Sequence, residues 1–127
     1  MSIPFNANRG LVIIPATLEG PSGTAHLNLA LDTGATATLI SSAILIAVGY
    51  DPALAPTRVQ VTTGSGVESV PLLSMNKLTA LGQDRFAFPV LGHTLPPSAS
   101  VDGVLGLDFL RGRLLTLDFR NGLITLA

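Results

Sequence analysis

The chain has 127 residues, enough for one domain with a single hydrophobic core. It carries 7 Lys and Arg against 8 Asp and Glu, a net charge of −1, and no basic cluster that would attract nucleic acid. It has no cysteine, which excludes disulfides, thiolate metal sites and cysteine nucleophiles.

The composition is 47% hydrophobic and only 12% charged, against about 25% charged residues in a typical soluble domain. We therefore expect some apolar surface to be buried against a partner, most simply a second copy in a homodimer. Residues 1–10 are polar and broken by Pro4, and residues 33–50 are interrupted by Gly34 and Gly49. This indicates neither a signal peptide nor membrane insertion, so we expect a soluble, cytoplasmic protein, although the sequence leaves its compartment open.

The first half of the chain predicts a hairpin that runs into an acidic residue. Residues 11–18 are apolar and β-branched, and the turn formers at 19–23 reverse the chain. Residues 26–31 then alternate between apolar and other side chains, as in a half-buried strand, and lead directly to Asp32. A short β-like segment at residues 38–40 follows.

A short helix is expected next, over residues 43–48, with Ser41 or Ser42 as its cap and Gly49 at its end. Residues 58–62 and 67–73 predict two strands that are joined by a flexible tip at Gly64, Ser65 and Gly66.

Further strands are expected at residues 75–81 and 86–91, followed by a loop that contains Pro96 and Pro97. A short helix at 107–110 comes before two strands that flank Asn121-Gly122, a typical two-residue hairpin turn. Residues 1–10 predict no strand. The pattern indicates a single all-β domain over residues 1–127, barrel-like, with one or two short helices.

Asp32 is the candidate catalytic residue, because it ends an apolar strand and is followed by a loop with Thr33 and Gly34. Hydrolysis of an amide by carboxylates needs two of them, one ionised and one protonated, which a shared proton provides. An Asp-Thr-Gly triplet does not recur, and Asp102 and Asp108 lack the flanking Thr-Gly. We expect a second copy to supply its own Asp32 across a two-fold axis.

The loop Asp32-Thr33-Gly34-Ala35 resembles the active-site loop of retropepsin-like aspartic proteases. Two further elements agree in their order along the chain. The segment Val104, Leu105, Gly106 resembles the family's hydrophobic-hydrophobic-Gly motif, and the tip formed by Gly64, Ser65 and Gly66 falls where the family has its flap. The resemblance covers roughly residues 11–126 and implies the retropepsin fold and a two-fold homodimer.

The resemblance also implies an aspartic endopeptidase that acts on extended peptide or protein substrates, with no metal and no other cofactor. By position, Asp32 would act as base and acid in alternate subunits, Thr33 would join the two active-site loops, and Gly34 would offer backbone to the substrate. The chain departs from viral members at Thr36 and Leu107, where they carry an Asp and an Arg, so that dimer lock is absent.

Residues 115–119 and 123–126 are our candidates for sealing the dimer instead. Ala35 cannot donate the hydrogen bond that a Ser there would give to ionised Asp32, so we expect a less acidic pH optimum than in members with Ser.

Other interpretations stay open from the sequence. Asp32 alone would suit a structural aspartate that caps its own turn, and the fold could serve a catalytically silent dimeric β module that binds peptides or partner proteins. Asp108 is expected to be solvated or to cap the short helix, and Asp102 to be a turn residue. His26 and His93 lack the spacing of metal ligands.

Overall fold

The computed structural model describes residues 1–96 and 98–127, so Pro97 of the expected proline-containing loop lies outside the described residues. The helical elements are α1 (Ser42–Ala47), the 3-10 helix η1 (Pro52–Leu54) and α2 (Leu107–Leu110). The strands are β1 (Ser2–Pro4), β2 (Ile13–Gly20), β3 (Gly23–Leu31), β4 (Leu39–Ser41), β5 (Thr57–Thr63), β6 (Gly66–Ala80), β7 (Gln83–His93), β8 (Gly103–Leu105), β9 (Leu115–Asp118) and β10 (Leu123–Leu126).

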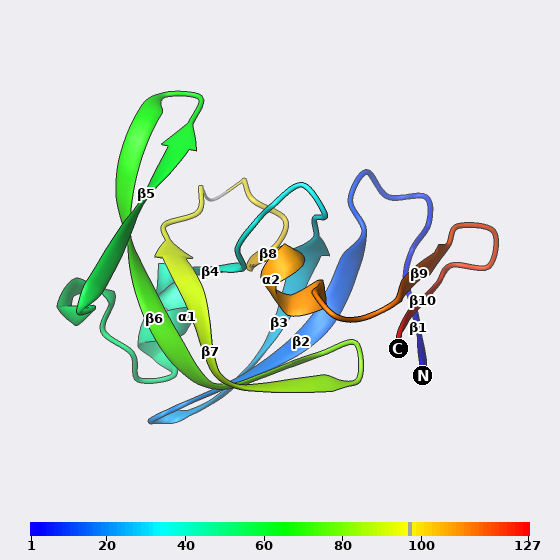
Figure 1. Cartoon of the computed structure of the whole chain (residues 1–127), viewed down its shortest axis with the longest axis horizontal. Coiled ribbons are helices and arrows are strands. Elements are labelled where there is room, and N and C mark those ends of the chain that lie inside the picture. The colour runs from blue at the N-terminus through cyan, green and yellow to red at the C-terminus, as the bar shows by residue number, and fades with distance from the viewer. Residues whose placement is uncertain (97) are drawn as a thin grey trace.

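A closed barrel forms the body of the molecule (Figure 1). Seven strands follow the order β2-β3-β8-β4-β7-β6-β5, and β2 pairs with β6 as well, which closes six of them into a barrel and leaves β5 outside. At this closing seam Glu19 lies opposite Lys77, and their side chains form an ion pair of 2.9 Å. The small barrel-like β fold with two short α-helices expected from the sequence is confirmed.

Buried and exposed side chains alternate along β3, and the buried ones point into the barrel. Leu27 and Leu29 are 3% and 0% exposed, while His26 and Asn28, which alternate with them, face solvent, as the period of two in a strand requires. The other strands except β5, and both α-helices, contribute to the same core. Its largest fully buried hydrophobic side chains are Phe109, Ile14, Leu18, Leu29, Ile40, Leu45, Met75, Leu78, Leu105, Ile124 and Val90.

The helices lie close to their expected positions. Ser41 occupies the N-cap of α1, as predicted, but its side chain makes no capping hydrogen bond. Gly49 follows the helix with φ of +102°, a left-handed conformation that glycine adopts without strain. Within the described part of the chain, no helix is both long and apolar enough to span a membrane.

The chain ends form a second, three-stranded sheet in the order β1-β10-β9. Ser2 lies opposite Thr125, so the N-terminal segment is a strand, although its sequence predicted none. Its partner is more than 120 residues away along the chain, and its Pro4 and polar neighbours carry no strand pattern of their own. Tertiary pairing therefore decides the conformation of this segment.

The turn between β9 and β10 differs from the expected two-residue hairpin. Asp118 lies opposite Leu123, so residues 119–122 form a four-residue loop. The Asp118 carboxylate explains the change. Its Oδ1 accepts hydrogen bonds from the backbone N–H groups of Arg120 and Asn121, and its Oδ2 accepts one from Asn121 Nδ2. Such side-chain bonds to the backbone stabilise a longer loop.

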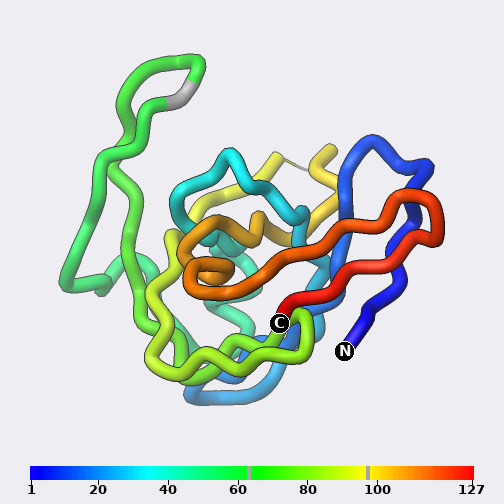
Figure 2. The backbone as a smooth tube through the Cα atoms, turned by 45° about the vertical axis from the view of Figure 1, so that its right-hand side comes forward, coloured from blue at the N-terminus to red at the C-terminus, as the bar shows by residue number. Residues whose placement is uncertain are grey.

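The β5–β6 hairpin projects from the barrel (Figures 1 and 2). Thr63 lies opposite Gly66, which places Gly64 and Ser65 at the turn, as the sequence predicts. The strand β6 continues without a break from Gly66 to Ala80, so its lower half pairs with β7 and belongs to the barrel while its upper half belongs to the hairpin.

Candidate active site

Asp32 follows directly after β3, and backbone contacts fix its position. Its N–H donates to the carbonyl oxygen of Leu105 at 3.0 Å, and its own carbonyl accepts from the N–H of Ala35 at 3.2 Å. The N–H of Gly34 donates to Asp32 Oδ1 at 2.8 Å. Within the described residues, Oδ2 has no partner. Asp32 and Gly34 are exposed, so one carboxylate oxygen is held by the loop and the other faces solvent.

The segment Val104, Leu105, Gly106 lies beside this loop. In the parallel pairing of β3 with β8, Leu31 is opposite Leu105. A Cβ on Gly106 would lie only 2.7 Å from the carbonyl carbon of Ala37 and 2.9 Å from the carbonyl oxygen of Ala35. Glycine therefore allows the close approach of the two segments. The structure thus brings together two motifs that are about seventy residues apart in the sequence.

A buried hydrogen-bond network also holds the Gly106 segment against the chain that follows the Asp32 loop. Thr38 is 0% exposed, and its N–H and Oγ1 donate to Asp108 Oδ2 and Oδ1 at 2.9 and 2.7 Å. The N–H of Gly106 donates to Thr38 Oγ1 at 3.1 Å. This corrects the expectation that Asp108 is simply a solvated or capping residue, because it is half-buried and anchors the loop. Sequence reasoning missed Thr38, whose only signal is its place shortly after Asp32.

Neither of the other nearby acids is available to pair with Asp32. The carboxylate of Asp108 bonds Thr38, and Asp102 Oδ2 accepts from the N–H of Asn28 at 2.8 Å. Asp102 thus has the structural role expected of it. A second catalytic carboxylate from this chain therefore has no candidate among these residues.

The predicted flap residues Gly64, Ser65 and Gly66 stand apart from this cluster. They form the exposed end of the projecting hairpin (Figure 2). The structure places them at a hairpin tip, as expected. It does not bring them to the Asp32 loop within a single chain.

The candidate sealing surface is only partly open. Leu115 and Leu117 pack against the core of their own chain. Phe119 is 56% exposed and makes an edge-to-face contact with Phe5, with ring centroids 5.3 Å apart. In the active-site loop, Thr33 is exposed, and its hydroxyl has no hydrogen-bond partner in the described part of the chain.

The two histidines lie in different surroundings. His26 Nδ1 is 3.4 Å from Thr17 Oγ1 on the exposed face of the β2–β3 hairpin. His93 contacts Glu68. In residues 1–96 and 98–127 no group of three or more His, Asp or Glu side chains lies close enough to hold a metal ion.

Comparisons with known proteins bear on the family and the fold of the chain. Residues 22–112 match the family model described as gag-polyprotein putative aspartyl protease. A retropepsin-like aspartic protease from Rickettsia conorii has a similar structure, with a TM-score of 0.72, 18% identity, and coverage of 99% of this chain and 88% of that one.

The retroviral protease-like domain of Ddi1 from Leishmania major is also similar, with a TM-score of 0.55, 16% identity, and coverage of 94% and 96%. No curated protein matches this chain in sequence. The matches show a retropepsin-like fold, as the sequence motifs led us to expect.

Proposed function

Because this chain belongs to the gag-polyprotein putative aspartyl protease family, we propose that it is an aspartic endopeptidase whose 127 residues act as a single domain. A water molecule would be activated between two Asp32 carboxylates, one from each subunit of a homodimer. The observation that carries the proposal is the Asp32 carboxylate itself. Its Oδ1 is held by the N–H of Gly34, and it lies exposed on a loop that Leu105 and Gly106 support.

The chemistry follows from placing two such carboxylates within about 3 Å of each other, where they cannot both ionise and share one proton. The ionised Asp32 takes a proton from water, and the resulting hydroxide forms a bond to the peptide carbonyl carbon. The protonated Asp32 gives its proton to the carbonyl oxygen. The Asp32 that took the proton from water then gives it to the nitrogen, while the other Asp32 takes a proton back from a hydroxyl of the tetrahedral carbon. The C–N bond breaks, an acid and an amine leave, and the pair again shares one proton.

Other residues have supporting roles in this proposal. The hydroxyl of Thr33, exposed and without a partner in the part of the chain that the structure describes, suits a contact with the partner's loop. Gly34 leaves room for the substrate backbone. The β5–β6 hairpin, with Gly64, Ser65 and Gly66 at its end, acts as a flap that closes over the peptide and excludes water. An extended peptide pairs with exposed strand edges. Leu31 and Val104 beside the loop favour apolar substrate side chains.

The test compares the parent with Asp32→Asn, using casein and a peptide mixture, with and without a pepstatin-type inhibitor. Asp51→Asn is the matched control, because Asp51 caps η1 through Ala53 and an Asn there retains this bond. We expect cleavage by the parent and the control but not by Asp32→Asn. Equal cleavage by all three proteins would rule out the assignment of Asp32.

The composite site has its own test, the mass of the protein in solution as a function of concentration. We expect a dimer under the conditions that support cleavage. A protein that stays monomeric yet cleaves would contradict a site built from two subunits. A dimer without any cleavage would instead favour the silent peptide-binding module.

A further inference from the structure

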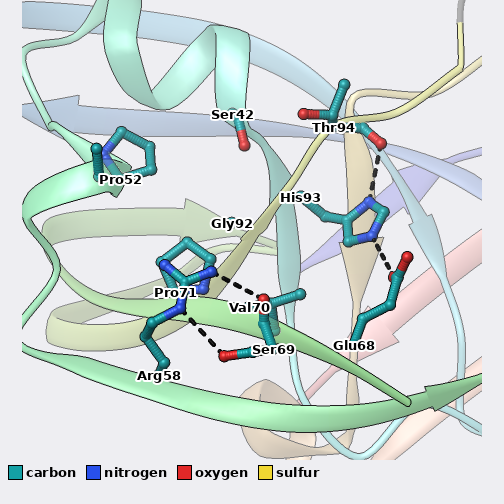
Figure 3. A pocket seen from close by; sticks show the side chains of 11 residues that line it. Ser42, Pro52, Arg58, Glu68, Ser69, Val70, Pro71, Gly92, His93 and Thr94 are labelled. Atoms are coloured by element: carbon teal, nitrogen blue, oxygen red, sulfur yellow. Dashed lines mark hydrogen bonds and ion pairs between the residues drawn. The ribbon is translucent and has the colours of Figure 1, made fainter.

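A cavity of about 600 Å³ lies between the base of the β5–β6 hairpin, the end of β7 and the start of α1 (Figure 3). Its charged or titratable lining residues are Arg58, Glu68 and His93. Ser42 of α1, with Pro52 and Ala53 of η1, contributes no charge to it. The cavity thus holds a histidine that the Asp32 site does not use.

Both ring nitrogens of His93 face oxygen atoms that only accept. Nδ1 lies 2.8 Å from the backbone carbonyl oxygen of Thr94, and Nε2 lies 3.0 Å from Glu68 Oε2 (Figure 3). A carbonyl and an ionised carboxylate have no proton to donate, and a neutral imidazole carries only one N–H. Both contacts are therefore hydrogen bonds only when His93 is the doubly protonated imidazolium.

The bond to Glu68 joins the projecting part of β6 to the end of β7, beyond the last backbone pair between these two strands. The pairing of β6 with β7 begins at Leu72, opposite Leu91, and continues towards the barrel. Glu68 lies four residues beyond that pair, on the projecting part of β6. His93 ends β7 and leads into the connection that reaches β8 and Gly106. Where the ladder has ended, this side-chain bond fastens the hairpin to the barrel.

We propose that His93 and Glu68 are a positioning pair for the flap, a latch that is closed when His93 is protonated and opens when it loses the proton. The inference rests on the proposed function, since it takes the β5–β6 hairpin to be the flap. With neutral His93, either Thr94 or Glu68 loses its donor. The geometry favours loss at Glu68, because Thr94 is the next residue in the chain and stays close.

The charges around His93 favour its protonated form, the form that closes the latch. The hydrogen bond that His93 donates to Glu68 is the largest influence on the ring and raises the His93 pKa above the ordinary value of 6.5. Among the described residues, Arg58 is the like charge that lines the cavity, and it donates from Nε and Nη2 to Ser69 Oγ and the Ser69 carbonyl. Since the folded pKa is raised, the latch is complete below pH 6.5 and is lost as the pH rises through the folded pKa.

The test uses Asp32→Asn as the background, so that cleavage plays no part in it. The chain has two histidines, and His26→Gln assigns their NMR signals and serves as the matched control. We expect His93 to titrate above pH 6.5, and Glu68→Gln to lower its midpoint. A His93 midpoint in the folded protein no higher than in the urea-unfolded chain would overturn the latch.

Hydrogen exchange of residues 57–70 provides the mechanical measurement. We compare variants at each pH, so that the intrinsic pH dependence of exchange cancels. A Gln at position 68 can accept from imidazolium or donate to neutral Nε2. We therefore expect the ratio of exchange rates between parent and Glu68→Gln to change severalfold between pH 5.5 and 8.5. A ratio independent of pH would overturn the proposal, and His26→Gln should leave these rates unchanged.

If the parent, with Asp32 intact, also cleaves peptides, its KM should rise as the pH passes through the His93 midpoint, while kcat changes less. The KM of the Glu68→Gln variant should not show this rise. Loss of the pH-dependent exchange together with intact cleavage would refute the latch alone. A working latch in a protein that never cleaves would refute only the proposed function.

Discussion

Thr38 and Asp108 are 70 residues apart in the chain, yet two hydrogen bonds of 2.9 and 2.7 Å join them beneath the Asp32 loop. The Thr38 hydroxyl also accepts from the N–H of Gly106. A single buried side chain thus links the loop to both the hydrophobic-hydrophobic-Gly segment and α2. The link secures the chain six residues after Asp32, next to the loop that carries the carboxylate.

Replacement of Thr38 by Val keeps the side-chain volume but removes the hydroxyl, and it leaves Asp108 Oδ1 and the N–H of Gly106 without that partner. We expect a loss of about 1–3 kcal/mol in the free energy of unfolding, measured by urea titration. Thr38→Ser retains the hydroxyl and is the control, with a smaller loss from the missing methyl group. Equal stability of the two variants would show that the network contributes little.

Gly106→Ala tests the close packing of the two motifs. The added Cβ would lie 2.7 Å from the backbone of Ala37, and such overpacking costs about 1–3 kcal/mol. We expect a lower Tm and a displaced Asp32 loop, visible in amide chemical shifts of residues 32–38. Gly10→Ala is the control, because nothing lies within 4 Å of its Cβ position. An unchanged Tm for Gly106→Ala would mean that the loop moves away without cost.

Ala35→Ser tests the pH dependence of the proposed reaction. A Ser hydroxyl at this position would donate to the ionised Asp32 and favour its charged form. We expect the acidic limb of the kcat/KM profile to move to lower pH, with the parent optimum mildly acidic to neutral. A parent profile that peaks near pH 2, or a limb that does not move, would contradict the argument from Ala35.

Asp118 gives a prediction about stability in acid. Hydrogen bonds from Asn121, backbone first and then side chain, lower the Asp118 pKa from the ordinary 3.8. Its contribution to stability is therefore present above pH 3.8 and lost as the pH falls through the lower, folded-state pKa. We expect Asp118→Asn to reduce the urea midpoint at pH 6 and to have a smaller effect at pH 2. An equal difference at both pH values would assign the effect to packing instead.

Local signals in the sequence predicted much of the fold, because most strands, the β5–β6 turn and α2 depend on patterns of a few neighbouring residues. Pairs of residues that are far apart in the chain could not be predicted from such local patterns. The strand β1 exists because Ser2 meets Thr125, and Asp108 bonds Thr38 across the fold. The signal of Asn121-Gly122 was wrong for a related reason, since Asp118 satisfies the backbone of a longer loop. The candidate site was predicted as separate motifs, and the buried network that joins them was not.

The terminal sheet has a consequence for how the chain could be rearranged. Since β1 and β10 are neighbouring antiparallel strands, the two chain ends lie at the same side of the molecule (Figures 1 and 2). A short linker could join them, and new ends could open between Gly64 and Ser65. Such a circular permutant would keep every strand pairing of the barrel while dividing the hairpin tip. Its folding would show whether the barrel needs an intact hairpin tip, and its activity would show what the intact tip contributes.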